Sequence, residues 1–410
     1  MQKNSVMFQL LDGILHAVEE IDSHNSSLDD ILDNHTVIKP EIRRMAAHWL
    51  FCIYRYRLDT VDYIRKFSST GKIKKTLSDL ASAGVVHCIF QTGIARELSV
   101  NAIVEYTKKK YGNSDSRFIN ALLRKVCREM PQFKARLPEW CSRKWQKIYG
   151  KDFISTAEKC LAEEPVQIFR LRPGFEISGF EAHAVEVEDF SHLSFFETPE
   201  IGKCLESECF KKGGIYIQDI ATGFSVELMA KYISSKIGGF IDVCGAPGGK
   251  AVMFHDMFPE WKITIGDRSA KRQKRTAENL QRCGVDAELL TCDASSFEFD
   301  NKYNAVFADV PCSNSGVFRK RPDALFRLNE KSLPEIVKIQ HDILENICHS
   351  VVENGLLVYS TCSIEPEEDG MQISKFCERH PEFKLLAEKL TLPDMKHDGS
   401  YCAVLRRGVK

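Results

Sequence analysis

Hydrophobic residues in the first third of the chain recur with the spacing of helices. Leu10 and Ile14 lie on one helical face, and the same period continues through residues 42–67 and 77–98. The pattern predicts an all-helical region over residues 1–130.

Polar residues and glycine mark two helix boundaries in this region. Ser99 is a suitable N-cap for a helix that ends at Tyr111, because Gly112 follows. Ser114 is expected to begin the next helix, which runs through Arg128.

The middle of the chain, residues 131–213, has a different pattern. The stretch 131–163, with prolines, tryptophans and several basic residues, predicts a helical connector. Short β-type runs at 166–171 and 184–187 then predict a small α+β subdomain over residues 164–213.

From residue 214 to residue 410, β-type runs alternate with helix-compatible stretches such as 221–236. This alternation predicts a doubly wound, mostly parallel α/β sheet of the Rossmann-like type. The β-type runs occupy 214–219, a central stretch from Phe240, 261–266, 287–291, 305–308 and 355–359.

Composition places the chain among soluble globular proteins, with 43% hydrophobic and 28% charged residues. Its first residues lack the basic segment and apolar core of a signal peptide, and no run approaches the roughly 18 apolar residues of a membrane span. We therefore expect a cytoplasmic protein without membrane contact. The 15 cysteines include no C-x-x-C pair, so neither a metal site nor a disulfide framework is expected.

Charge is distributed unevenly along the chain. Residues 1–150 hold 24 Lys and Arg against 16 Asp and Glu, a net charge of +8. From the totals of 56 and 57, residues 151–410 hold 32 against 41, a net charge of −9. A basic helical region favours a polyanionic partner such as nucleic acid, and a solvated helical surface without a partner fits the charge equally well.

The segment 240–251, FIDVCGAPGGKA, predicts a strand, a tight turn and a helix. Gly248 and Gly249 lack a Cβ, so their backbone can adopt a positive φ and approach a ligand. The helix N-terminus behind the turn offers free N–H groups. Asp267 follows the next strand at the spacing usual for an acid that holds ribose hydroxyls. These features indicate a nucleoside-containing cofactor.

Each of these features also has a plainer explanation. Glycine serves many strand-to-helix turns for steric reasons, and Asp267 could act only as a helix cap. The turn is not G-x-G-x-x-G, which disfavours a dinucleotide, and Ala251 after Lys250 argues against a P-loop.

Two cysteines and a further acid follow strands at the same predicted edge of the sheet. Cys312 lies in DVPC after Asp309, Cys362 lies in STCS, and Asp293 follows the strand at 287–291. The carboxyl edge of such a sheet is where ligands bind. Proline and small polar neighbours favour exposed loops for both cysteines, whereas a buried structural cysteine is the alternative for any one of them.

Together these segments resemble the RsmB/Fmu (Sun) family of RNA cytosine-5 methyltransferases, whose bacterial members modify small-subunit ribosomal RNA. The segments that carry the resemblance are DVCGAPGGK (242–250), GDR (266–268), CDA (292–294), DVPCSNSG (309–316), RPD (321–323) and YSTCSIEPEED (359–369). In addition, SRFINALLR (116–124) is similar to the FVNAVLR signature of NusB-like RNA-binding domains.

The resemblance implies a class I methyltransferase core at 214–410 that uses S-adenosylmethionine, preceded by an all-α NusB-like domain at 1–130. It also implies which residues lie near the cofactor, with Asp267 on the ribose and Asp293 on the adenine side. The residues implied for the cofactor site are Cys244, Gly245, Ala246, Pro247, Gly248, Gly249, Lys250, Asp267, Arg268, Asp293 and Asp309.

The family's chemistry assigns roles to the reacting residues. Carbon 5 of cytosine becomes nucleophilic when a thiolate adds to carbon 6, and the resemblance gives that role to Cys362. Asp309 would hold the ring at N3 and the exocyclic amine, and Lys250 could orient Asp309. Cys312 would assist removal of the carbon-5 proton and release of the adduct. DNA cytosine-5 methyltransferases use the cysteine of the Pro-Cys motif as nucleophile, so the residues alone leave the two roles interchangeable.

The chain departs from the family pattern without losing a reacting group, and the substrate is more open than the reaction. Transfer RNA, or less readily DNA, is an alternative to small-subunit ribosomal RNA, and a non-enzymatic RNA-binding assembly protein with an idle core is a third possibility. We expect a monomer. The departures are Gly245, Ala251, Val310, Asn314 and Asp369, where the family usually has Ala, Ser or Thr, Ala, Gly and Asn.

Overall fold

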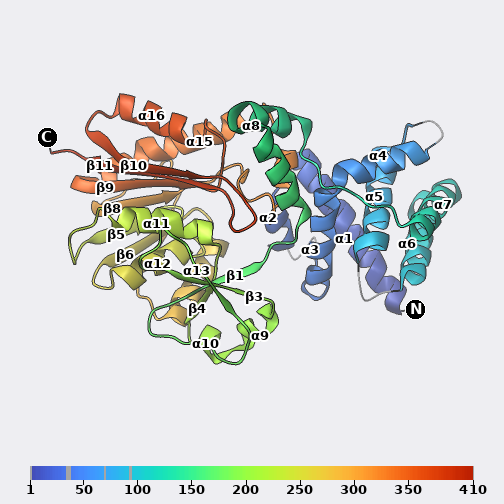
Figure 1. Cartoon of the computed structure of the whole chain (residues 1–410), viewed down its shortest axis with the longest axis horizontal. Helices are drawn as coiled ribbons and strands as arrows, with labels where there is room; N and C mark the ends of the chain where they lie inside the picture. Colours follow the sequence, from blue (N-terminus) through green and yellow to red (C-terminus); the bar gives the residue numbers. More distant parts are fainter. Residues whose placement is uncertain (1, 34–37, 69–70, 92–94, 410) are drawn as a thin grey trace. The chain divides into compact units, whose positions relative to one another are not determined.

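The computed structural model describes residues 2–33, 38–68, 71–91 and 95–409. The chain forms two compact units (Figure 1). The helical unit comprises Met1–Glu164 and Phe318–Asn329, and the sheet unit comprises Pro165–Val317 and Glu330–Lys410.

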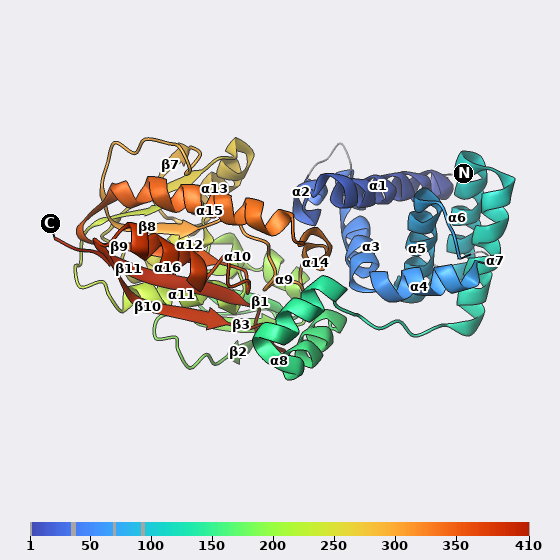
Figure 2. The ribbon, with the colours of Figure 1, turned by 90° about the horizontal axis from the view of Figure 1, so that it is seen from above.

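The helical unit is built from helices that pack around one apolar core, as the period of the sequence predicts. Figure 2 shows α1 and α4 on opposite sides of this unit, with α3 and α5 between them. Its helices are α1 (Gln2–His24), α2 (Leu28–Asp33), the 3₁₀ turn η1 (Pro40–Ile42), α3 (Arg43–Arg55), α4 (Arg57–Phe67), α5 (Lys75–Phe90), α6 (Arg96–Tyr111), α7 (Asn113–Glu129), α8 (Glu139–Ala162) and α14 (Ala324–Arg327).

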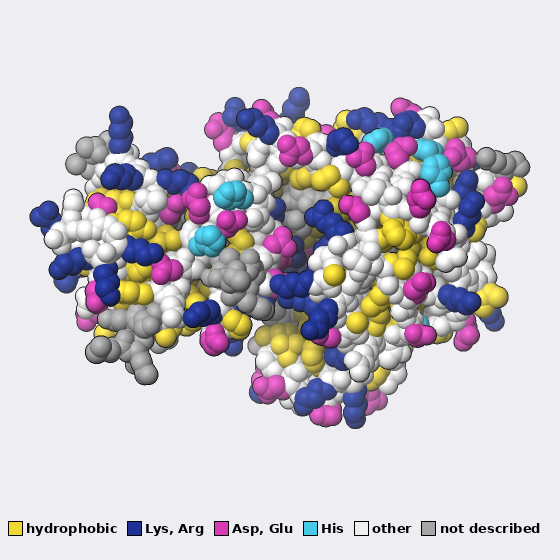
Figure 3. All heavy atoms as spheres, turned by 180° about the vertical axis from the view of Figure 1, so that it is seen from behind, with side chains coloured by type: hydrophobic (Ala, Val, Ile, Leu, Met, Phe, Trp, Pro, Cys, Tyr) yellow, Lys and Arg dark blue, Asp and Glu magenta, His cyan; other side chains and the backbone are white. Residues whose placement is uncertain are grey.

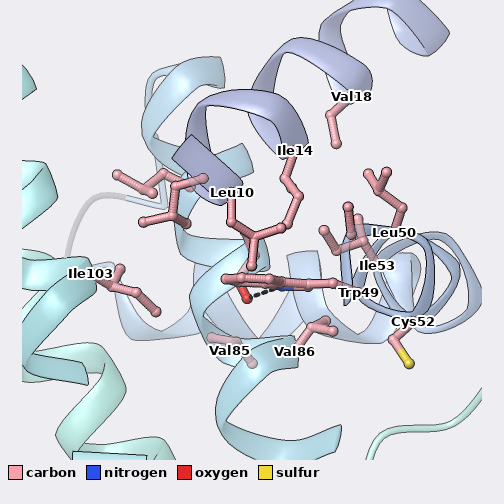
Figure 4. Close-up of a cluster of buried hydrophobic side chains, with 14 of the residues drawn as sticks. Leu10, Ile14, Val18, Trp49, Leu50, Cys52, Ile53, Val85, Val86 and Ile103 are labelled. Carbon is pink, nitrogen blue, oxygen red and sulfur yellow. Dashed lines mark hydrogen bonds between the residues drawn. The ribbon is translucent and has the colours of Figure 1, made fainter. Parts of the chain in front are cut away.

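The core of the helical unit surrounds Trp49, whose side chain is fully buried (Figure 4). Leu10 and Ile14 of α1 lie over the indole, and its Nε1 donates a hydrogen bond of 2.8 Å to the Ala83 carbonyl. Close packing of α5 on α7 depends on Gly84, because a Cβ there would lie 3.0 Å from a methyl carbon of Leu123. The indole ring of Trp49 is thus held by the side chains packed against it and by the hydrogen bond of its own Nε1.

Two helix boundaries differ from the sequence expectation. The run 77–98 is not one helix, because α5 ends at Phe90 and α6 begins at Arg96; residues 92–94 lie outside the described residues. Ser99 is not an N-cap but an interior residue of α6, where its Oγ lies 2.7 Å from His87 Nε2. The predicted end of α6 is confirmed, since Gly112 caps it at a φ of 94°.

A short segment from the C-terminal half, Phe318–Asn329, belongs to the helical unit. Phe318 stacks on Trp145 with ring centroids 5.8 Å apart, and the Leu28 backbone N–H donates to the Asp323 carboxylate at 3.2 Å. The predicted catalytic domain, residues 214–410, included this segment with its RPD motif. Its packing depends on residues far away in the chain, which no local pattern reveals.

The sheet unit contains a seven-stranded sheet of order β10-β11-β9-β8-β5-β6-β7, which confirms the mostly parallel α/β prediction. β7, β6, β5, β8 and β9 are parallel, and β10 and β11 add antiparallel pairs at one edge. The strands are β5 (Gly239–Asp242), β6 (Lys262–Asp267), β7 (Glu288–Thr291), β8 (Tyr303–Asp309), β9 (Val351–Thr361), β10 (Phe383–Thr391) and β11 (Ser400–Arg407).

Helices cover both faces of this sheet, with α15 and α16 on one face and α11, α12 and α13 on the other (Figure 1). Successive side chains of a strand point to opposite faces of the sheet. In β5, Phe240 accordingly packs with α12, whereas Ile241 packs with α15. The helix predicted at 221–236 is shorter than expected. The helices and 3₁₀ turns are η2 (Ile220–Thr222), α11 (Gly223–Ala230), α12 (Gly249–Met257), α13 (Ala270–Cys283), α15 (Ser332–Ile347), η3 (Cys348–Ser350) and α16 (Gly370–Arg379).

A small antiparallel sheet of order β2-β3-β1-β4 precedes the large sheet in the chain. Buried Arg170 of β1 and Arg172, which directly follows this strand, both bind the carboxylate of Asp256 on α12, at 2.6 and 2.7 Å, so the small sheet is anchored to α12. Its elements are β1 (Gln167–Leu171), β2 (His183–Val185), β3 (Ser194–Thr198), α9 (Ile201–Glu206), α10 (Glu208–Lys211) and β4 (Ile215–Ile217).

Candidate active site

The sequence-predicted site residues lie at the carboxyl ends of neighbouring parallel strands. β5 is paired with β6 on one side and with β8 on the other, and β8 is paired with β9. The loops that follow these strands therefore meet at one edge of the sheet, as open α/β sheets arrange their ligand sites.

The turn between β5 and α12 uses its glycines in different ways. Gly248 has a φ of 95°, which L side chains rarely adopt, and it directly precedes α12. A Cβ on Gly249 would lie 2.7 Å from Gln218 Nε2, and one on Gly245 would lie 2.7 Å from the Asp242 carboxyl carbon. Tyr216 OH donates to the Pro247 carbonyl at 3.0 Å and so ties the turn to β4. The backbone of this turn is compact and held in place.

Cys244 and Ala246 complete this predicted cofactor turn. The Cys244 backbone N–H lies 3.4 Å from Asp242 Oδ1, and burial, with Asp242 nearby, raises the pKa of the Cys244 thiol well above its ordinary value. Cys244 is thus held as a neutral thiol, and its main contribution to the turn is shape and backbone N–H.

Asp267 ends β6 and is almost completely buried. Its Oδ1 accepts from the Ser269 backbone N–H at 2.8 Å and from Arg272 at 2.9 Å, whereas Oδ2 is buried with no hydrogen-bond partner among the described residues. The N-cap of α13 is Ser269, so capping does not account for Asp267. A buried carboxylate oxygen without a partner is costly unless a ligand satisfies it, and a ribose hydroxyl is a suitable donor.

Arg268 and Asp293, also predicted at this edge, are exposed. Asp293 Oδ1 accepts from the backbone N–H and the hydroxyl of Ser295, at 3.0 and 2.7 Å, and these bonds lower the pKa of Asp293. Both residues stand where β6 and β7 end, next to Asp267 in sheet order. An ionised Asp293 is suited to accept a hydrogen bond from a polar ligand.

Lys250 and Asp309 form an ion pair across the ends of β5 and β8. Burial opposes the charge of Lys250, but the Asp309 and Asp242 carboxylates raise the lysine pKa above its ordinary value. Ser360 donates a hydrogen bond of 2.9 Å to the other oxygen of Asp309. The pair fixes the Asp309 carboxylate beside the two cysteine loops.

The two cysteines predicted to react lie together. Their sulfur atoms are 2.9 Å apart, longer than the about 2.05 Å of an S–S bond, and both cysteines are free. They converge because β8 and β9 are parallel and in register, with Asp309 opposite Ser360. The hydrogen bond with Cys362, followed by burial, raises the pKa of the Cys312 thiol well above its ordinary value.

Asn314 contacts the nucleophile assigned by the family resemblance. Its Nδ2 donates to the Cys312 carbonyl at 3.3 Å, which directs Oδ1 toward Cys362, and the Cys362 thiol donates to this oxygen at 3.0 Å. The backbone φ of Asn314 is 60°. A left-handed residue explains why the family has Gly here and why Asn, which tolerates this conformation, can replace it.

Asp242 and Glu368 are site residues that were not predicted from the sequence. Burial and the neighbouring Asp309 carboxylate raise the pKa of Asp242 to about 8. Glu368 is completely buried and hydrogen-bonded to both cysteine loops. The available signals were the position of Asp242 in a hydrophobic strand and that of Glu368 near the end of the second cysteine motif. Neither position indicates, before the fold is known, that the carboxylate is buried.

Among the described residues, no cluster of three or more potential metal ligands occurs. No helix within the described ranges is long and apolar enough to cross a membrane.

Two family models match this chain. Residues 235–404 match the family described as 16S rRNA methyltransferase RsmB/F, and residues 1–128 match the NusB family. The first of these ranges contains all the predicted site residues.

Three curated relatives are each described as ribosomal RNA small subunit methyltransferase B. The protein of Photorhabdus laumondii is 36% identical over 179 residues, 43% of this chain and 41% of the relative. That of Erwinia tasmaniensis is 32% identical over 230 residues, 51% and 53% of the two chains. These two alignments span about half of the relatives' length or less, whereas a Shigella boydii protein is 26% identical over 90% of both chains.

Solved structures share the fold. The crystal structure of PH0851 has a TM-score of 0.74 at 20% identity and covers 98% of this chain and 99% of its own. NSun6 from Pyrococcus horikoshii, solved with SFG, has a TM-score of 0.57 at 18% identity and covers 67% of this chain and 99% of its own. At these identities the likeness concerns the fold alone.

Proposed function

Because this chain belongs to the RsmB/F family of S-adenosylmethionine-dependent methyltransferases, with a NusB-family domain at its N-terminal end, we propose that it methylates carbon 5 of a cytosine in small-subunit ribosomal RNA. The observation that carries the proposal is the pair of thiols, Cys312 and Cys362, 2.9 Å apart beside the Lys250–Asp309 ion pair. Cytosine carbon 5 needs a thiolate at carbon 6 before it can accept a methyl group, and this site offers two candidate thiols.

The residues around the first turn fit the cofactor. S-adenosylmethionine supplies an electrophilic methyl group when it is bound. The turn at 244–250 would hold its methionine and ribose parts, since Gly248 permits a close backbone approach. The unpartnered oxygen of Asp267 would accept a hydrogen bond from a ribose hydroxyl. Asp293 would lie on the adenine side of the cofactor, with Arg268 beside it.

Cys362 acts as the nucleophile: its thiol first loses its proton to solvent, and the resulting thiolate adds through Sγ to carbon 6 of the cytosine. Asp309 holds the ring at N3 and the exocyclic amine, and Lys250 keeps Asp309 in place. Addition saturates the bond between carbons 5 and 6 and makes carbon 5 electron-rich, so that it can take the methyl group.

Cys312 then assists removal of the carbon-5 proton, after which the bond between carbon 6 and Sγ breaks and the double bond is restored. The raised pKa of Cys312 disfavours the thiolate that attack on carbon 6 requires, and it makes that thiolate, once formed, a good acceptor for the carbon-5 proton. The reversed assignment, with Cys312 as nucleophile, predicts the opposite behaviour of the two alanine variants.

Ribosomal RNA is the proposed partner, and the helical unit, with its NusB-family match, is the proposed site of RNA contact. Figure 3 shows many Lys and Arg side chains on one face of this unit. We propose a monomer that acts in the cytoplasm, where ribosome assembly supplies the substrate.

Transfer of a radioactive methyl group decides between substrates. The full chain is incubated with tritiated S-adenosylmethionine and, in parallel, with small-subunit ribosomal RNA, transfer RNA or DNA. We expect label in ribosomal RNA, its loss with Cys362→Ala, and one unconverted cytosine in bisulfite sequencing of the product. Label in transfer RNA or DNA alone would support those substrates instead. A cofactor-binding protein that labels none of the three would support an idle core.

A further inference from the structure

Glu368 connects the two loops that carry the cysteines. It lies in the turn after β9, and its side chain is completely buried. One oxygen, Oε1, accepts from the Ser313 backbone N–H at 2.8 Å and from Gln340 Nε2 at 3.0 Å. The other, Oε2, accepts from the Ser313 hydroxyl at 2.5 Å and from the Ser363 hydroxyl.

The two serines directly follow the two cysteines in the chain. Ser313 succeeds Cys312, and Ser363 succeeds Cys362, so a single carboxylate contacts the residue next to each thiol. Buried carboxylates are rare unless paired or fully hydrogen-bonded, and here four donors meet the two oxygens. The cost of burying Glu368 is offset only while both loops keep their positions.

Other bonds join the same two loops but do not include the side chain of Glu368. The Gly316 backbone N–H donates to the Cys362 carbonyl at 3.0 Å, and the Ile364 N–H donates to Ser315 Oγ at 3.0 Å. Gln340 of α15 donates to the Pro311 carbonyl as well as to Glu368. Glu368 is thus the shared acceptor of a network that spans both loops.

The carboxylate also affects the charge state of one thiol. After the hydrogen bond to Cys362 and the burial of the sulfur, the nearby Glu368 carboxylate contributes to the raised pKa of Cys312. Burial raises the pKa of Glu368 itself, and the hydrogen bonds from Ser313 and Ser363 oppose this rise. Backbone and amide N–H groups can only donate, so Oε1 is an acceptor in either state.

We propose that Glu368 is a positioning residue that sets the separation of Cys312 and Cys362 by holding Ser313 and Ser363 together. The proposal rests on the proposed function for its catalytic consequence but not for its geometric one. Without Glu368, the two loops lose their common acceptor and the thiols move apart. Misplacement of reacting groups by about 1 Å can cost about 100-fold in rate.

The separation of the thiols can be measured without substrate. Diamide oxidises two neighbouring thiols to a disulfide: two S–H bonds break, one S–S bond forms, and the oxidant takes up both hydrogens. Mass spectrometry of peptides isolates the Cys312–Cys362 product from those of other cysteines. We expect rapid formation in the unsubstituted chain and at least about tenfold slower formation in Glu368→Ala.

Methyl transfer provides the second measurement. In Glu368→Ala, kcat should fall about 10- to 100-fold while KM for RNA and cofactor affinity stay unchanged, because substrate-binding groups are not altered. Glu368→Gln, which keeps an acceptor oxygen for the Ser313 N–H, should recover part of both the crosslinking rate and kcat.

The matched control is Gln372→Ala. Gln372 is also buried, and its side chain donates at 2.8 Å to the Val337 carbonyl of α15 rather than to either serine. A folded Glu368→Ala protein with unchanged crosslinking overturns the proposal, as does a loss in Gln372→Ala equal to that in Glu368→Ala.

If Glu368→Ala does not fold, Ser313→Ala and Ser363→Ala each remove one hydroxyl bond to Glu368 and should each slow crosslinking; normal crosslinking in both overturns the proposal. These measurements also test the positioning role of Glu368 separately from the proposed methyl transfer to RNA. Slow crosslinking in Glu368→Ala, in a chain that methylates no RNA even when unsubstituted, supports the positioning role and contradicts the proposed function.

Discussion

At the scale of single residues, the two adjacent thiols should respond differently to substitution. Cys362→Ala should abolish both methyl transfer and the covalent RNA complex, because no other group then adds to carbon 6. Cys312→Ala should still attack and methylate, but it should release RNA poorly and leave an RNA-linked protein that survives denaturing gel electrophoresis. The opposite pattern would give Cys312 the nucleophilic role, as in the DNA enzymes, and no adduct in either variant would leave both roles without support.

Asp267 provides a separate test of the cofactor site. Its buried Oδ2 has no partner among the described residues, so we expect it to bind a ribose hydroxyl. Asp267→Ala should weaken S-adenosylmethionine binding by about 1–3 kcal/mol, the range for losing a charged hydrogen-bond partner. Titration calorimetry measures the change, and Asp293→Ala, which alters an exposed carboxylate, should have a smaller effect. Equal affinity in Asp267→Ala and the unsubstituted chain would remove Asp267 from the site.

At the scale of elements, the turn before α12 should be sensitive to a single methyl group. Gly248 has a φ of 95°, and the left-handed conformation costs an L residue about 1–2 kcal/mol. Gly248→Ala should therefore lower the free energy of unfolding by about that amount and also weaken cofactor binding.

Gly284 offers a matched control for this substitution. It ends α13 at a φ of 64°, and a Cβ there would meet no atom within 4 Å. Gly284→Ala should lower the free energy of unfolding to a similar extent, measured by urea denaturation, and leave cofactor affinity unchanged. Parallel losses of cofactor affinity in both variants would attribute the effect to general destabilisation.

The elements that carry the chemistry were the easiest to predict from sequence. β5, β6, β8 and the last part of β9 are apolar runs that end in distinctive turns, so strand and site residue are encoded side by side. β10 and β11 were missed. β10 lies at an edge of the sheet, its interior positions are a mixture of exposed and half-buried residues without regular alternation, and it has no turn motif.

Interactions between distant residues account for the rest. The hydrogen bonds of Glu368 reach Gln340 and Ser313, and those of Asp323 reach the start of α2. Ser99 looked like a cap because serine favours caps, but its bond to His87 on the preceding helix holds it inside α6. Local propensity cannot show such partners, which exist only after the chain has folded.

At the scale of the whole molecule, the basic charge of the helical region should appear as salt-dependent RNA binding. Arg117, Arg124 and Arg128 are exposed at spacings that place them along one face of α7. Replacing all three by Ala should weaken RNA binding and reduce the salt slope of the affinity by up to about 0.9 for each phosphate that an arginine no longer neutralises. Fluorescence anisotropy over a salt series measures both quantities.

A charge-matched control is the replacement of three exposed lysines of the sheet unit by Ala. It should change the slope less than the arginine variant does, and an equal change would mean that overall charge, rather than α7, determines binding. Truncation before residue 151 is a poorer test, because it removes the partners of Phe318 and Asp323. The three lysines are Lys203, Lys211 and Lys212.

The inclusion of Phe318–Asn329 in the helical unit makes that unit a split domain. A protease that cut once between residues 164 and 165 would produce two fragments. The larger fragment carries Phe318–Asn329, which packs in the helical unit that the smaller fragment otherwise forms, so the two fragments should stay together. Two bands on a denaturing gel and a single species in gel filtration are the expected result. By the same reasoning, the fragments 1–164 and 165–410, expressed separately, should reassemble by complementation, with Phe318 and Asp323 supplied by one piece to complete the fold of the other.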